Sequence, residues 1–212
     1  MVKNILFDLD GTLTDPKEGI TKCVQYALEK FDINADCEEL VPFIGPPLMT
    51  SFREFYGLSN QQCELAVKYY RERFAKVGLF ENYPYEGISE VLAKLKKDGY
   101  ILAIATSKPT VFSHRICDKF GLTEYFDLIK GSELDGTNAE KIDVMKFVMN
   151  ELKTDPEETI MVGDRKFDIL GAKELGMKSV GVTFGYAAPG ELEEAGADYI
   201  IDDMAKLFEI LE

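Results

Sequence analysis

Six short apolar segments, each bounded by turn residues, constrain the fold of this 212-residue chain more than any other feature. They are residues 5–7, 100–106, 126–131, 159–164, 179–185 and 197–202. The segments are continuous rather than alternating, which is typical of strands buried on both faces of a parallel sheet. Helical patterns of apolar residues lie between them, over residues 87–97, 139–152 and 167–175 among others. Because strand and helix alternate, the sequence predicts an α/β fold, a Rossmann-like three-layer core with a mainly parallel sheet.

The stretch from Lys17 to Gly78 interrupts this alternation, with three helical patterns and no strand pattern. The loop "IGPPL" (44–48) joins the first two of these helices. A helical insert after the first strand is expected to cover a site at the edge of the sheet, where parallel sheets bind ligands. We therefore expect an α/β core formed by residues 1–15 and 83–212, and a small all-helical cap domain formed by residues 16–82.

The charge of the chain limits its partners. The 38 acidic residues outnumber the 24 Lys and Arg residues and give a net charge of −14, which disfavours nucleic acid and anionic membranes. A small anionic substrate is compatible with this charge if a metal ion and lysines reverse it locally. The four cysteines lack a CxxC spacing, and no leader or membrane-length apolar run is present. We expect a cytoplasmic protein with free thiols that is a monomer or homodimer.

Acidic residues follow two of the predicted strands directly. Asp8 and Asp10 come after the first strand, and Asp164 ends the fourth. Since the carboxyl ends of parallel strands lie at one edge of a sheet, the three carboxylates are expected to share a site. Hard cations such as Mg²⁺ bind separated carboxylates of this kind, and water and phosphate complete the coordination. Aspartates also favour loops and helix N-termini, which is the structural alternative for each residue taken alone.

Four further residues lie near the same edge, and each has a structural alternative. Thr106 and Ser107 could hold phosphate oxygens, or could be a strand residue and a helix N-cap. Lys141 opens a helix, where the helix dipole disfavours a cation, so it is either a phosphate-site lysine or an ordinary surface residue. Asp168, four residues after Asp164, could orient a lysine or a metal-bound water, or could interact with the helix dipole.

These motifs resemble those of a known family. The segments "DLDGTLT" (8–14), "TSK" (106–108) and "GDRKFD" (163–168), together with Lys141, are similar in type and order to the four motifs of the haloacid dehalogenase superfamily of phosphotransferases. The helical insert also falls where that family places its first type of cap. The loop "IGPPL" and the segment at 181–201 resemble the phosphoglycolate-phosphatase-like branch, some members of which are described as 5'-nucleotidases or pyrophosphatases.

The resemblance implies specific roles. Asp8 would be the nucleophile that forms an aspartyl-phosphate, and Asp10 would be the general acid and base. Mg²⁺ would be held by the Asp8 side chain, the Asp10 backbone carbonyl and Asp164. Thr106 and Lys141 would stabilise the transferring phosphoryl group. Backbone flexibility at Gly11 and the hydroxyl of Ser107 would complete the phosphate site.

The resemblance implies a Mg²⁺-dependent phosphatase acting on small phosphomonoesters, of the phosphoglycolate phosphatase type, with a 5'-nucleotidase or pyrophosphatase as the alternative. A dehalogenase would not use the second aspartate as acid and base. A sugar-phosphate mutase ranks lower, because such enzymes commonly carry an acidic residue where this chain has Gly163. A phospho-accepting switch would be shorter and would lack the insert. Turnover distinguishes a hydrolase from such a switch.

Substrate choice is expected to depend on the insert. Arg53, Arg71 and Arg73 are candidates for binding a second anionic group of the substrate, although solvated helix positions explain them equally well. The loop that is expected to reach the site is formed by Gly45, Pro46 and Pro47, and a rigid turn between helices is its alternative.

Overall fold

The computed structural model of the chain describes residues 1–138 and 140–211. Its contacts define two compact units: Met1–Thr14 with the chain from Pro84 onward, and Asp15–Tyr83. The chain passes between the units within two short strands, β2 (Thr14–Asp15) and β3 (Tyr83–Pro84), which pair as a two-stranded sheet. Ala139, the first residue of the predicted 139–152 helix, and Glu212, the last residue of the predicted core, lie outside the described residues.

A six-stranded sheet forms the centre of the first unit, with all neighbouring strands parallel and the order β5-β4-β1-β6-β7-β8. The strands are β1 (Asn4–Phe7), β4 (Ile101–Pro109), β5 (Leu128–Ser132), β6 (Thr159–Gly163), β7 (Lys178–Val182) and β8 (Tyr199–Ile201). Each predicted apolar segment contributes one strand, so the parallel α/β prediction is confirmed. In the register, Phe7 lies opposite Ile104 on one side and Val162 on the other. The ends of β1, β4 and β6 therefore meet at one edge.

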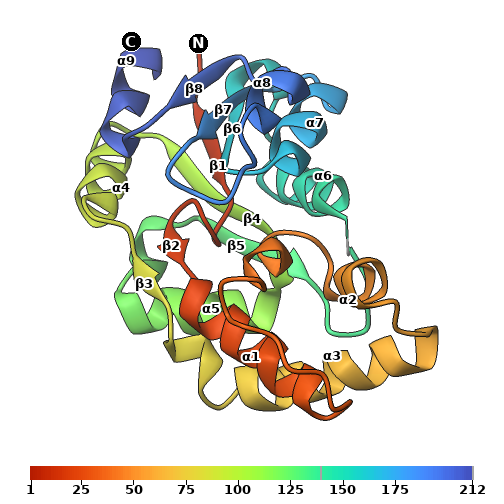
Figure 1. Cartoon of the computed structure of the whole chain (residues 1–212). Coiled ribbons are helices and arrows are strands. Elements are labelled where there is room, and N and C mark those ends of the chain that lie inside the picture. Colours follow the sequence, from red (N-terminus) through yellow and green to blue (C-terminus); the bar gives the residue numbers. More distant parts are fainter. Residues whose placement is uncertain (139, 212) are drawn as a thin grey trace. The chain divides into compact units, whose positions relative to one another are not determined.

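Helices cover both faces of this sheet, which confirms the three-layer prediction. They are α4 (Ile88–Lys97), α5 (Thr110–Phe120), α6 (Lys141–Leu152), α7 (Lys166–Glu174), α8 (Glu191–Ala195) and α9 (Leu207–Leu211), with short 3₁₀ helices η3 (Thr123–Tyr125), η4 (Pro156–Glu158) and η5 (Met204–Lys206). Figure 1 shows α6 and α7 on one side of β1 and α4 on the other. Val144 and Met145 of α6 pack with Leu6, Met161 and Ala172 in a fully buried core. This core fixes the strand ends that carry the polar residues.

The second unit contains α1 (Lys17–Glu29), η1 (Val41–Phe43), α2 (Leu48–Tyr56), α3 (Asn60–Phe74) and η2 (Gly78–Phe80). These elements form the helical insertion predicted after the first strand. Helix α3 packs against both α1 and α2. At Gly19 the backbone of η2 approaches so closely that a Cβ would lie 2.1 Å from the carbonyl oxygen of Gly78. A glycine is therefore required where α1 meets η2.

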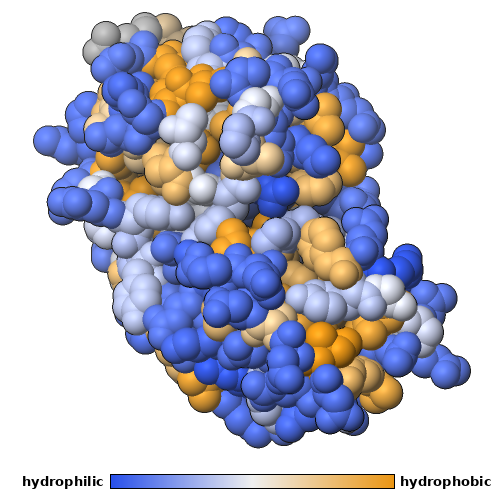
Figure 2. All heavy atoms as spheres, in the orientation of Figure 1, coloured by the Kyte–Doolittle hydropathy of each residue, from blue (hydrophilic) through white to orange (hydrophobic). Residues whose placement is uncertain are grey.

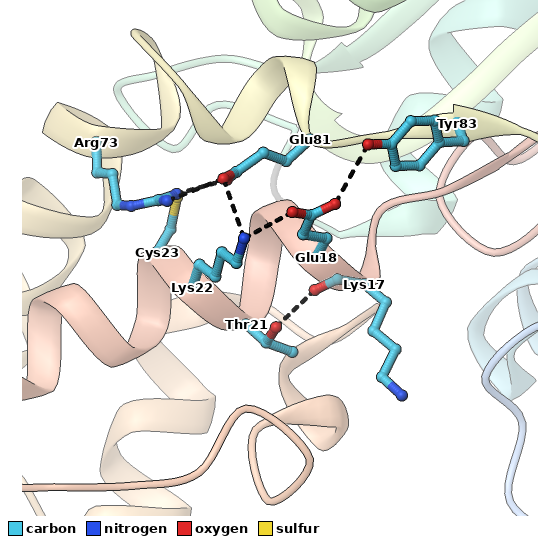
Figure 3. A network of polar contacts seen from close by, with 8 residues as sticks. All are labelled: Lys17, Glu18, Thr21, Lys22, Cys23, Arg73, Glu81 and Tyr83. Carbon is cyan, nitrogen blue, oxygen red and sulfur yellow. Dashed lines mark hydrogen bonds and ion pairs between the residues drawn. The ribbon is translucent and has the colours of Figure 1, made fainter.

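A charge network inside this second unit joins α1, α3 and the segment after η2 (Figure 3). The Arg73 guanidinium donates to both oxygens of Glu81, at 2.7 and 3.1 Å. Lys22 lies 2.6 Å from Glu18 and 3.5 Å from Glu81, and the Tyr83 hydroxyl donates to Glu18 at 3.3 Å. Arg73 lowers the pKa of Glu81 by donating to it, and burial only partly opposes this. Two basic and two acidic side chains thus neutralise one another here.

Figure 2 shows one face of the molecule, on which hydrophilic residues predominate and apolar residues form separate patches. This surface agrees with the net charge of −14. Among the described residues, no helix combines the length and the apolar composition that a membrane crossing requires. The cytoplasmic location stays a prediction.

Candidate active site

The turn that follows β1 presents the first two aspartates. The backbone N–H of Asp8 donates to the Val162 carbonyl of β6, and the chain then turns back so that the N–H of Gly11 donates to Thr14, both at 2.8 to 2.9 Å. Gly11 has a φ of +83°, a conformation that side chains disfavour. A Cβ at this position would also lie 2.2 Å from Asp164 Oδ2. Gly11 is therefore required both for the turn and for the approach of β6.

Lys141 lies at the centre of the site. Its Nζ atom is 2.7 Å from Asp8 Oδ1 and 2.9 Å from Asp168 Oδ1, and it donates to the Ala105 carbonyl at 3.1 Å. Burial lowers the pKa of Lys141, but Asp168 and Asp8 outweigh it, so the pKa is raised. The surface-lysine alternative is therefore wrong, and Lys141 is a buried cation between two carboxylates.

Asp8, Asp164 and Asp168 form an acidic cluster, with one oxygen from each lying within 4.8 Å of the others. Asp164 accepts from the Tyr186 backbone N–H at 2.7 Å and from the Thr12 hydroxyl at 3.3 Å. Burial, reinforced by Asp8 and Asp168, raises the pKa of Asp164 well above its usual range. Burial also raises the pKa of Asp168 to about 6, although Lys141 acts against it. The three carboxyl groups therefore lie close together, and Lys141 alone does not neutralise all of them.

Glycines allow this close packing. A Cβ at Gly163 would lie 2.1 Å from Asp168 Cγ, and a Cβ at Gly185 would lie 2.3 Å from Asp164 Cβ. The N–H of Arg165 donates to Asp168 Oδ2 at 3.1 Å, which fixes that carboxylate in the first turn of α7. Asp168 therefore combines both roles weighed from the sequence, since it lies at a helix start and contacts the buried lysine.

Lys108, the last residue of "TSK", is a site residue that was not predicted from the sequence. Its Nζ atom lies 2.7 Å from Asp10 Oδ2, and its side chain is only 5% exposed. Burial raises the pKa of Asp10, while Lys108 acts to lower it. The available signal was the position of Lys108, two residues after Thr106 on a strand that neighbours β1. This position alone does not predict with which carboxylate Lys108 forms an ion pair.

Thr106 and Ser107 lie on β4, which extends to Pro109. Thr106 is buried, and its hydroxyl accepts from the Lys108 N–H at 3.3 Å. Helix α5 begins at Thr110 after Pro109, so the alternative of Ser107 as an N-cap is wrong. The backbone carbonyl of Ser107 accepts from the Ser132 hydroxyl at 2.8 Å. This contact ties the end of β4 to β5.

The residues expected to select the substrate belong to the second unit. Gly45 has a φ of +105°, and the loop continues through Pro46 to Pro47, which directly precedes α2. The Arg53 guanidinium donates to the Asn60 side chain at 3.0 Å, and Arg73 pairs with Glu81. The proposed contacts of these residues with substrate stay predictions.

The site has a charge imbalance that fits a divalent cation. Asp8, Asp10, Asp164 and Asp168 supply four carboxylates, against the ammonium groups of Lys108 and Lys141. With all six side chains ionised, two negative charges would be left over in a largely buried site, and ionisation there is costly unless a cation neutralises it. The donor set is all oxygen, which suits Mg²⁺.

A family model, haloacid dehalogenase-like hydrolase, matches residues 5–182 of the chain. The protein belongs to the haloacid dehalogenase-like hydrolase family. The chain is 43% identical over 210 residues to a Pseudomonas aeruginosa protein named 5'-nucleotidase, covering 99% of this chain and 95% of that one. It is 37% identical over 183 residues to tyrosine-protein kinase PtkA of Mycobacterium tuberculosis, covering 86% of this chain and 62% of that one.

Among solved structures, that of a predicted phosphatase from Clostridium acetobutylicum superposes with a TM-score of 0.96 at 46% identity. The match covers 100% of this chain and 99% of the other. The family expected from the four motifs is therefore confirmed, as is the α/β core with a helical insertion. The chain is accordingly an enzyme, a phosphatase of the haloacid dehalogenase type.

Proposed function

We propose that this enzyme hydrolyses small phosphomonoesters in a Mg²⁺-dependent reaction that passes through an aspartyl-phosphate, an acyl phosphate formed on Asp8. The observation that carries the proposal is the position of Lys141, whose Nζ contacts both Asp8 and Asp168 within 2.9 Å. A lysine held there neutralises charge beside the nucleophile without occupying both oxygens of Asp8. An incoming phosphate would find a carboxylate and a cation side by side.

In the first half-reaction, an oxygen of Asp8 attacks phosphorus and the bond to the ester oxygen breaks. Asp10 gives its proton to the departing oxygen, so that an alcohol leaves. Lys141 and the hydroxyl of Thr106 interact with the phosphoryl oxygens, whose charge must be met by positioned donors. The turn at Gly11 places Asp8 and Asp10 close together, while its own N–H donates to the Thr14 carbonyl, so the predicted contact of Gly11 with phosphate stays a prediction.

In the second half-reaction, Asp10 is a carboxylate and takes a proton from water as that water attacks phosphorus. The acyl-phosphate bond breaks, inorganic phosphate leaves, and Asp8 is regenerated. The side chains of Asp8 and Asp164 and the backbone carbonyl of Asp10 would hold Mg²⁺, which when bound supplies charge neutralisation for the phosphoryl group. Asp168 keeps Lys141 beside Asp8 throughout.

We propose nucleoside 5'-monophosphates as the first substrate class to test, because the Pseudomonas aeruginosa relative named 5'-nucleotidase covers nearly the whole chain. The resemblance drawn from the sequence pointed to 2-phosphoglycolate first, and that substrate stays a prediction. Pyrophosphate is the third candidate. One relative is named a tyrosine-protein kinase. A tyrosine hydroxyl should therefore be compared with water as the acceptor of the phosphoryl group.

The test measures phosphate released with Mg²⁺ from nucleoside 5'-monophosphates, 2-phosphoglycolate, sugar phosphates and pyrophosphate. Asp8→Asn should lower turnover by about 10³-fold or more while preserving the fold, because the nucleophile is lost. The matched control is Asp143→Asn, the same change at an exposed position two residues from Lys141, which should retain activity. Turnover close to that of the wild type in Asp8→Asn would refute the nucleophile assignment.

If the folded wild type releases no phosphate from any of these compounds, a mutase or a phospho-accepting switch becomes the better explanation. A small acyl phosphate would then be used to label the protein. A stable phosphate on Asp8 would favour the switch, and interconversion of sugar phosphates would favour the mutase.

A further inference from the structure

The end of β4 is irregular where it carries Lys108. The pairing of β4 with β5 shifts register between Ala105 and Pro109. Irregularities of this kind redirect side chains and are frequent beside active sites. Here the shift coincides with two buried polar side chains, Thr106 and Lys108, two residues apart.

Neighbouring residues hold this irregular segment in place. A Cβ at Gly131 of β5 would lie 1.9 Å from the Lys108 carbonyl oxygen, so only glycine allows the two strands to come this close. The Thr110 hydroxyl donates to the Gly131 carbonyl at 3.1 Å and accepts from the Gly131 N–H at 3.0 Å. The Ser132 hydroxyl bonds to Ser107. The conformation that presents Lys108 is therefore fixed by several independent contacts.

The Lys108 ammonium reaches one oxygen of Asp10. The Nζ–Oδ2 distance is 2.7 Å, and the two side chains are 5% and 13% exposed. The other oxygen, Oδ1, is buried and has no hydrogen-bond partner among the described residues. Lys108 thus orients the Asp10 carboxylate through one oxygen, and no hydrogen bond from the described residues to the other oxygen competes with that orientation.

We propose that Lys108 is a positioning residue that fixes the orientation in which the Asp10 carboxyl group gives a proton to the leaving oxygen and takes one from water. The inference rests on the proposed function, in which Asp10 is the acid and base. It predicts that losing Lys108 impairs proton transfer more than it impairs binding of the phosphate.

The experiment compares kcat/KM for two substrates in the Mg²⁺-loaded enzyme. One is p-nitrophenyl phosphate, whose leaving group needs little protonation, and the other is a nucleoside 5'-monophosphate, whose alkoxide leaving group needs a proton. In Lys108→Met the loss should be about 10- to 100-fold larger for the nucleotide, because general acid catalysis contributes at least that much. Lys108→Arg should restore part of the difference.

A double-variant comparison separates this role from a merely structural one. If Lys108 acts through Asp10, then Lys108→Met should not change the ratio of the two kcat/KM values in an Asp10→Asn background. The matched control is Lys130→Met, which removes a largely buried lysine on β5 that pairs with Glu133. That variant should leave the ratio unchanged.

The outcomes distinguish the inference from the proposed function. An equal loss on both substrates in Lys108→Met, or a further change of the ratio in the Asp10→Asn background, would overturn the positioning role and leave the phosphatase intact. An Asp8→Asn variant that still turns over would instead overturn the proposed function. If Lys108→Met does not fold, Lys108→Gln and Lys108→Arg give the same comparison.

Discussion

In the α/β unit three buried carboxylates and the partly buried Asp10 face two lysines, whereas the network of the helical unit pairs Glu18 and Glu81 with Lys22 and Arg73. With every side chain ionised, the first group has a formal charge of −2, whereas the second is neutral. Their environments differ too, since Asp164 and Asp168 are 0% exposed, while the side chains of Glu18 and Lys22 are about 40% exposed.

The difference in charge and exposure distinguishes a ligand-binding site from a network that only stabilises the fold. A neutral, partly exposed network stabilises its unit modestly and needs nothing else. An uncompensated buried cluster costs stability, and proteins retain such clusters where a ligand completes them. Changing a carboxylate to an amide should therefore have opposite effects on stability in the two places.

Among the changes that test this comparison, the largest effect is expected from removing the central cation. Lys141→Met should lower turnover by about 10²–10³-fold, because charge on the transferring phosphoryl group is no longer met. It should also lower the free energy of unfolding by about 3–5 kcal/mol, since Asp8 and Asp168 lose their buried partner. Steady-state kinetics with Mg²⁺ measures the effect on turnover, and urea unfolding in EDTA measures the effect on stability. The control is Lys146→Met, at an exposed position of the same helix. Wild-type turnover in Lys141→Met would contradict the assignment of the acidic cluster as a catalytic site.

Asp164→Asn should stabilise the metal-free protein. Its raised pKa shows that the ionised form is disfavoured, and an amide can keep the contacts with Tyr186 and Thr12. The midpoint of thermal unfolding in EDTA should rise by about 2–4 °C for each kcal/mol gained.

The same variant should lose its response to magnesium. Mg²⁺ at a hundred times its Kd should stabilise the wild type by about 2.7 kcal/mol, and Asp164→Asn by much less. A variant that is destabilised in EDTA and still responds fully to Mg²⁺ would show that Asp164 is a structural residue. Recovery of wild-type activity by Mg²⁺ after EDTA treatment is the accompanying check.

Glu81→Gln should act in the opposite direction and lower the free energy of unfolding by about 1–3 kcal/mol, because it breaks charge-assisted bonds to Arg73. The pKa of Glu81 is depressed in the folded state, so its contribution is fully present above the unfolded carboxyl pKa of about 4.3 and is lost as the pH falls from there through the lower pKa of the folded state. Urea unfolding at pH 7 and pH 3 should show the difference between variant and wild type shrinking at pH 3. A difference independent of pH would exclude the ion pair as its source.

The smallest effect on stability is expected for Arg53→Met, within about 0.5 kcal/mol, because the hydrogen bond from Arg53 to the Asn60 side chain joins two exposed residues. Measuring KM for a nucleoside 5'-monophosphate in the same variant tests the predicted role in specificity. A higher KM at unchanged stability would support that role, and an unchanged KM would assign Arg53 to the solvated surface of α2.

The sequence by itself determined the strands, the helices and the family. Apolar runs and helical periodicity are local signals, so they located the six strands of the parallel sheet and the helical insert without knowledge of any contact, whereas the two-residue strands β2 and β3 were not predicted. The spacing of Asp8 and Asp10 and the segment "GDRKFD" are local as well, and they identified the acidic residues at the edge of the sheet.

Only the tertiary structure decided which charges meet. The pairing of Lys108 with Asp10 depends on β4 lying beside β1 and on the irregular end of β4, which Gly131 on a third strand permits. The burial of Lys141 between Asp8 and Asp168 likewise joins three elements that are far apart in the chain. Ion pairs act through space over a few ångströms, whereas sequence patterns report only the periodicity of one segment. The partners of a buried charge are therefore fixed by the sheet order and packing of the folded chain.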